Sequence, residues 1–112
     1  MDVAAEVVTY LTESTGIPWY HDRPRHAPAE CGTVTRDGGP TELVRDMPTL
    51  TLIVYAASRG RAADLAALAK GALLHMQWQV PNVFGTEVMG DYYDPVDGMH
   101  RHRVTASLII ND

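Results

Sequence analysis

The sequence predicts an α+β domain in which two helices are packed on one face of a mainly antiparallel sheet. Two segments repeat apolar residues every three or four positions, which is typical of helices, and several shorter segments alternate apolar and polar residues as strands do. Clusters of Gly, Pro and Asp separate the strands. The expected order is α-β(β)-β-β-α-β-β in one domain over residues 1–112, because 112 residues are too few for two typical domains.

The first helix is expected over residues 2–14, where apolar side chains fall on one face. Asp2 is a suitable N-cap, since its carboxylate can accept a hydrogen bond from the first turn. Gly16 and Pro18 are expected to end the helix. Residues 17–21 then predict a short edge strand, because a proline is tolerated at the edge or the start of a strand.

A hairpin is expected next, with residues 31–36 and 41–45 as its strands and Gly38-Gly39 in its turn. Its polar residues predict an exposed position. Residues 49–57 form the clearest strand of the chain, with Leu50, Leu52 and Val54 on the core face.

The second helix is expected from the N-cap Ser58 to about Met76. Trp78, just beyond it, is interpreted as a cover for the end of the core. Strands are then expected over residues 83–89 and 101–110, with a turn at residues 94–98 between them. The predicted buried stripe of the second helix consists of Leu65, Leu68, Ala69, Ala72, Leu73 and Met76.

Composition excludes several classes of protein. Nine basic against fourteen acidic side chains give a net charge of −5, whereas proteins that grip nucleic acid are usually basic. No apolar run approaches the ~18 residues that a membrane-spanning helix needs. The single cysteine cannot form a disulfide within the chain. The 46% hydrophobic content argues against a disordered chain.

The sequence contains none of the common phosphate-binding, zinc-binding or nucleophile motifs, so we expect no enzyme and no cofactor. His100 and His102 share a face of the last predicted strand and could bind a metal with a third ligand such as Asp94, Asp97 or His75. A pair of surface histidines beside a turn is the preferred interpretation.

Six of the arginines fall in Arg-x-Arg pairs, at positions 23/25, 59/61 and 101/103. Arginine is enriched in protein interfaces and binds carboxylates in pairs of parallel hydrogen bonds, which favours subunit contacts. Solvated surface charge is the alternative. A nucleic-acid patch is disfavoured by the net charge.

Four segments in their order along the chain, residues 34–39, 46–50, 55–59 and 94–101, resemble a phage family. The chain looks like the small tail terminator, or tail completion, proteins of long-tailed phages and prophages, the group similar to the lambda tail terminator. The resemblance covers almost the whole chain and depends on the order and spacing of the motifs. It implies a small α+β domain that forms a hexameric ring at the head-proximal end of the tail tube, stops tube polymerisation and joins the tail to the head, without a catalytic site.

The resemblance also implies partners. These are further copies of the chain, the tail tube protein and head–tail connector proteins, in the host cytoplasm during assembly and then at the head–tail junction of the virion. DNA would pass through the ring without specific binding, and no membrane is involved. The residues expected at subunit contacts are Arg36, Asp46, Tyr55, Arg59, Asp94, Arg101 and Arg103.

The sequence departs from the family pattern where His102 follows Arg101, since an aromatic residue often follows that arginine. Two other functions stay open at this point. One is a head-completion or connector protein of the phage neck, and the other is an unrelated small α+β binding module.

Overall fold

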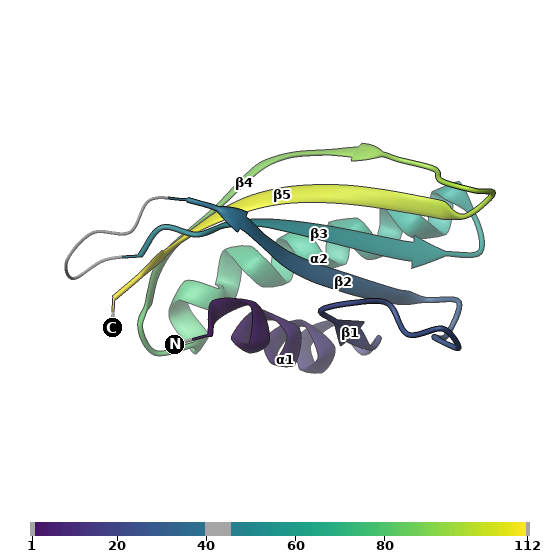
Figure 1. Ribbon diagram of the computed structural model, residues 1–112. Coiled ribbons are helices and arrows are strands. Elements are labelled where there is room, and N and C mark those ends of the chain that lie inside the picture. Colours follow the sequence, from purple (N-terminus) through teal and green to yellow (C-terminus); the bar gives the residue numbers. More distant parts are fainter. Residues whose placement is uncertain (1, 40–45, 112) are drawn as a thin grey trace.

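A computed structural model describes residues 2–39 and 46–111, and within these residues it confirms the α+β fold (Figure 1). The described strands form one sheet in the order β1-β2-β3-β5-β4, antiparallel except for the parallel β1–β2 pair. The molecule is elongated, with principal extents of 43 × 23 × 23 Å. The elements in chain order are α1 (Val3–Thr15), β1 (Trp19–Tyr20), β2 (Cys31–Gly38), β3 (Thr49–Ala56), α2 (Arg59–Gln79), β4 (Val83–Tyr93) and β5 (His100–Ile110).

Both helices lie on the same face of the sheet, below it in Figure 1. α2 packs on β3, β4 and β5, while α1 packs on β1, β2 and the side of α2. The core lies between the two layers and is supplied by every second residue of the central strands, as the alternation in the sequence predicts. Its central members are Leu50, Leu52 and Val54 of β3 and Val104, Ala106 and Leu108 of β5, all essentially inaccessible to solvent.

The helix ends follow the local chemistry that the sequence predicts. The Asp2 carboxylate accepts a hydrogen bond from the backbone N–H of Ala5 at 3.1 Å. Gly16 adopts φ 78°, a left-handed conformation in which its N–H reaches the carbonyl of Thr12 and ends α1. Ser58 caps α2 by accepting from the N–H of Arg61 at 3.1 Å.

The expected hairpin needs a partial correction. Residues 41–45, its second strand, lie outside the described residues, and β2 pairs with β3 instead. The first half of β2 is buried rather than exposed, because Trp19 of β1 packs on Gly32 and the neighbouring strands flank it. β4 also runs on to Tyr93, four residues past the predicted end, since it stays paired with β5 up to His102.

The prediction that Leu68 and Trp78 of α2 belong to the core is wrong. Leu68 is 47% exposed and Trp78 is 72% exposed. α2 contacts the sheet along the line of Ala62, Leu65, Ala69, Leu73 and Met76. Leu68 lies on the flank towards α1, where the two helices leave an open groove, and Trp78 lies on the outer surface near the end of the helix.

This difference predicts unequal effects of two leucine-to-alanine substitutions on the same helix. Leu65→Ala is expected to lower the free energy of unfolding by about 3 kcal/mol, because Leu65 is 3% exposed and its removal leaves a cavity. Leu68→Ala should cost less than about 1 kcal/mol, since much of that side chain already contacts water. Urea unfolding of the two variants checks this, and equal losses would mean that Leu68 belongs to the core.

Candidate functional site

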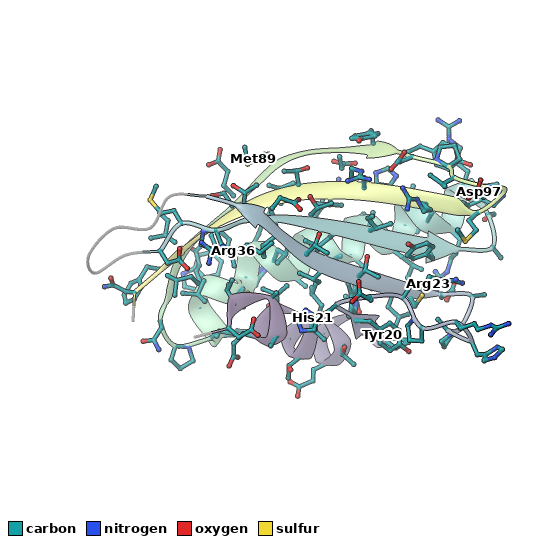
Figure 2. All side chains as sticks on the ribbon, in the orientation of Figure 1. Tyr20, His21, Arg23, Arg36, Met89 and Asp97 are labelled. Atoms are coloured by element: carbon teal, nitrogen blue, oxygen red, sulfur yellow. The ribbon has the colours of Figure 1, made fainter. Side chains whose placement is uncertain are left out.

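The structure brings five of the seven predicted contact residues to one end of the sheet. Tyr55 lies opposite Arg101 in the β3–β5 register, and Arg103 follows two residues later on the same face. The other two, Arg36 and Asp46, lie at the opposite end. Figure 2 shows Arg36 towards one end of the molecule and Arg23 and Asp97 at the other.

Asp94 is at the centre of the first group. Its carboxylate accepts hydrogen bonds from Nη2 of Arg101 at 2.7 Å and from Nε of Arg103 at 3.0 Å, and its carbonyl accepts from Nε of Arg101 at 3.0 Å. These bonds, that of Arg103 first, hold the pKa of Asp94 below its ordinary value against the opposing effect of desolvation. The two arginines therefore fasten the turn between β4 and β5 onto the sheet.

Tyr55 supplies an aromatic surface for two arginines. The guanidinium carbon of Arg23 lies 4.9 Å from the centre of the Tyr55 ring, and that of Arg101 lies 5.9 Å from it. Arg23 belongs to the connection between β1 and β2, residues 21–30, which we call the basic loop. Tyr55 is 9% exposed, so the side chains above it cover most of the ring.

Arg59 makes a similar contact from the first position of α2. Its guanidinium carbon lies 4.4 Å from the centre of the Tyr93 ring, and the Tyr93 hydroxyl is 2.7 Å from Nδ1 of His100. We call the whole group the arginine–tyrosine cluster: Arg23, Arg59, Arg101, Arg103, Tyr55, Tyr93 and Asp94. Sequence reasoning did not place Arg23 and Tyr93 in this group, since only the fold brings their segments together.

At the opposite end, Arg36 and Asp46 form a two-bond ion pair with both N···O distances at 2.7 Å. The hydrogen bond to Asp46 is the main cause of a raised pKa of Arg36. The backbone of Asp46 also pairs with Ile110 in both directions, at 2.8 and 2.9 Å. The pair thus joins the end of β2 to the segment before β3 and to the end of β5. Both predicted groups make their contacts within the chain, and their contact with other copies stays a prediction.

The histidines proposed as metal ligands have other partners. His100 contacts Tyr93, and Nε2 of His102 lies 2.7 Å from Asp91, which also accepts from Nζ of Lys70 at 2.8 Å. Lys70 and then His102 hold the pKa of Asp91 below its ordinary value. Within residues 2–39 and 46–111, no three His, Cys, Asp or Glu side chains are arranged to hold a metal ion. None of the helices in this part of the chain is long and apolar enough to cross a membrane.

Two sets of exposed apolar side chains were not predicted. The helix patch is the name we give to the exposed apolar side chains of α2, which are Leu68, Leu74 and Trp78 and are 42–72% exposed. Leu68 borders the groove towards α1, whereas Leu74 and Trp78 are not among the residues that line it. The strand patch consists of Phe84, Met89 and Tyr92 on the edge strand β4, which are 55–64% exposed. Met89 projects from β4 away from the helices in Figure 2. Exposed groups of this kind mark contact surfaces more often than isolated apolar residues do.

No protein-family model matches this sequence, and no curated protein matches it.

The low pKa of Asp94 predicts a pH effect on stability. A carboxylate whose folded-state pKa is depressed stabilises the folded state above its unfolded pKa, near 4, and this contribution is lost as the pH falls through the folded value. The melting temperature of the wild type should therefore fall more steeply than that of Asp94→Asn between about pH 5 and pH 2. Thermal melts across this range test the prediction, and parallel curves would contradict it.

Proposed function

We propose that this protein is the subunit of a homo-oligomeric, hexameric ring that ends the phage tail tube at its head-proximal end and joins the tail to the head. One observation carries the proposal: large apolar side chains are exposed on two different elements, the helix patch on α2 and the strand patch on the edge strand β4. A ring of identical copies is built from head-to-tail contacts, in which two unlike surfaces of each subunit meet.

The strand patch supports assembly through its place in the sheet. β4 is an edge strand of eleven residues, and a long edge with apolar side chains invites pairing with other chains unless it is shielded. Bulges between Val83 and Gly85 and between Val88 and Gly90 bend it, which limits uncontrolled pairing. A neighbouring subunit that covers Phe84 and Met89 would remove this exposed area from water.

The use of the arginines supports a channel through which DNA slides without being held. Arg36, Arg61, Arg101 and Arg103 each bind a carboxylate, and Arg23 and Arg59 lie over tyrosine rings. Guanidinium groups whose N–H donors are bound to carboxylates offer less to phosphates than free ones do. Together with the net charge of −5, this favours a wall that repels DNA slightly over one that binds it.

The proposed partners are the tail tube protein on one side and head–tail connector proteins on the other, with assembly in the host cytoplasm and a final place in the virion. A connector of the phage neck is the nearest alternative, because it would use the same two apolar surfaces to form a ring. An unrelated binding module would instead use the open groove between α1 and α2 for a ligand.

The proposal is tested by deleting the gene from its phage and by measuring the mass of the purified protein by light scattering, alone and with tail tubes. We expect overlong, irregular tails that fail to join heads, and rings in solution or on the ends of tubes. A stable monomer that never caps a tube would overturn the proposal. Tails of normal length that fail to join heads would assign the protein to the neck instead.

A pair of variants makes the test specific to the strand patch. Phe84→Ser with Met89→Ser should leave the monomer folded, because both side chains are exposed, but should prevent complementation of the deletion. Val96→Ser, on the turn between β4 and β5, is the matched control, since Val96 is exposed outside both patches. If both variants complement the deletion, the exposed side chains of β4 are not needed for assembly.

A further inference from the structure

An open groove of about 470 Å³ runs between the outer surfaces of α1 and α2. Its α2 side is formed by the small or apolar residues Ala67, Leu68, Gly71 and Ala72 together with His75 and Gln79, and its α1 side by Tyr10 and Ser14. On the α1 side, the hydroxyl of Tyr10 donates to the carbonyl of Ala72 at 2.6 Å, and on the α2 side Nδ1 of His75 lies 2.8 Å from the carbonyl of Gly71, so both of these polar groups already have a partner. The groove therefore presents apolar surface that remains in contact with water in the single subunit.

The rim of this groove is acidic. Glu6 lies four residues before Tyr10 and Glu13 three residues after it, so both exposed carboxylates fall on the Tyr10 side of α1, beside the residues that line the groove. The sequence of α1 contains no Lys or Arg. The basic residues Lys70 and Arg61 of α2 are bound to Asp91 and Glu30. The groove thus suits an apolar segment that carries positive charge.

The basic loop contains such a segment. Arg23 on Tyr55 anchors one side of the loop, and the Glu30–Arg61 ion pair anchors the other. Between these anchors, residues 24–29 read Pro-Arg-His-Ala-Pro-Ala, with an exposed Arg25 as the second residue and no acidic residue. A hydrogen bond from the Ala27 N–H to the Pro24 carbonyl, at 3.1 Å, bends this tip into a turn. A segment that is already bent and restricted by prolines loses little conformational freedom when it binds.

We propose that the tip of the basic loop of one copy, residues 24–29, docks in the α1–α2 groove of the next copy, with Arg25 against Glu6 and Glu13. The loop is anchored at the end of the molecule that holds the arginine–tyrosine cluster, where Figure 2 places Arg23, whereas the groove lies on the helix layer. Contact between two unlike surfaces is head to tail, the arrangement that closes into rings. The inference rests on the proposed function and adds a surface and its occupant to it.

Two glycines of α2 provide a matched test. A Cβ added at Gly71, in the groove, or at Gly60, in the first turn outside it, would meet nothing within 4 Å. Leucine has a higher helix propensity than glycine, and at both positions its Cβ meets no neighbour. We expect Gly71→Leu to raise the dissociation constant of self-association by about ten-fold or more, and Gly60→Leu to change it by less than about two-fold. Sedimentation of the purified variants measures both, and circular dichroism verifies that each is folded.

A charge exchange tests the occupant directly. Arg25→Glu and Glu13→Arg should each weaken self-association, and the double variant should regain most of the loss, because opposite charges again face each other. A disulfide between Gly71→Cys and Ala27→Cys should link separate copies under oxidation, whereas Gly60→Cys in place of Gly71→Cys should not. Cys31 is buried and does not compete for the reaction.

The outcomes separate this inference from the proposed function. If the wild type forms rings or caps tubes while Gly71→Leu and both charge reversals assemble like it, the docking is wrong and the ring stands. If Gly71→Leu forms normal rings that no longer join tubes or heads, the groove holds another virion protein and the docking is equally wrong. If the wild type neither assembles nor caps tubes, the proposed function fails, and the docking fails with it.

Discussion

Gly32→Val should lower the melting temperature of the protein by about 15 °C, which corresponds to roughly 3 kcal/mol of stability in a domain of this size. Gly32 lies directly opposite Trp19 in the β1–β2 pair, and the indole ring of Trp19 covers it. A Cβ at position 32 would stand 2.3 Å from the ring, so the tryptophan must leave its place. Trp19 is 3% exposed, and its Nε1 donates to Thr15, so its displacement also opens the contact between α1 and β1.

Tryptophan fluorescence can follow this change. Trp78, which is 72% exposed, is replaced by phenylalanine so that the emission comes from Trp19 alone. The emission of Gly32→Val should then shift to the red at temperatures where the parent still shows a buried indole. The double variant with Trp19→Leu should recover part of the lost stability, because the smaller side chain makes room. An unchanged melting temperature in Gly32→Val would show that the packing of Trp19 does not depend on a glycine at position 32.

Tyr55→Ala should lower the free energy of unfolding by about 3 kcal/mol and should also affect two neighbouring segments. The Tyr55 ring is 9% exposed and lies under the guanidinium groups of Arg23 and Arg101. Its removal leaves a cavity on the sheet and removes the ring that Arg23 of the basic loop contacts. We therefore expect earlier proteolysis within residues 21–30 as well as a lower melting temperature.

Tyr55→Phe is the control, since it keeps the ring and removes the hydroxyl. It should stay within about 0.5 kcal/mol of the wild type, because none of the hydrogen bonds among the described residues uses this hydroxyl. Limited proteolysis and chemical unfolding of both variants give the comparison. If Tyr55→Phe folds normally but fails to assemble, the hydroxyl contacts another copy of the chain. If Tyr55→Ala is as stable and as protease-resistant as the wild type, the ring does not hold the loop.

Local signals in the sequence were sufficient for most of the fold. Alternating residues in β3 and β5 placed the core face correctly, and Asp2, Gly16 and Ser58 marked helix ends through hydrogen bonds within a few residues. The position of Leu68 could not be obtained in this way. Its spacing fits the buried stripe of α2, and its exposure depends on how far α1 lies from that flank, which is a property of the tertiary packing.

The polar clusters show a similar division. The Arg101–Asp94 bond joins residues seven apart around one turn, so the motif in the sequence pointed to it. The contact of Arg23 with Tyr55 joins segments that meet only because β3 pairs with β2, where the basic loop ends. The two apolar patches were not predicted, because hydropathy alone does not distinguish a side chain that is buried in the core from one that stays exposed on the surface.

The order of strands affects how the protein folds while it is synthesised on the ribosome. The β3–β5 register pairs Ala56 with His100 and Thr49 with Ser107, so roughly fifty residues are translated between one partner and the other. At 5–20 residues per second, β3 waits some 3–10 s with one apolar edge open to other nascent chains. Insoluble product during expression is therefore expected to depend on translation speed and temperature more than on the stability of the finished subunit. Once β5 has been synthesised, it pairs with the open edge of β3, which then lies in the middle of the sheet and can no longer pair with other chains.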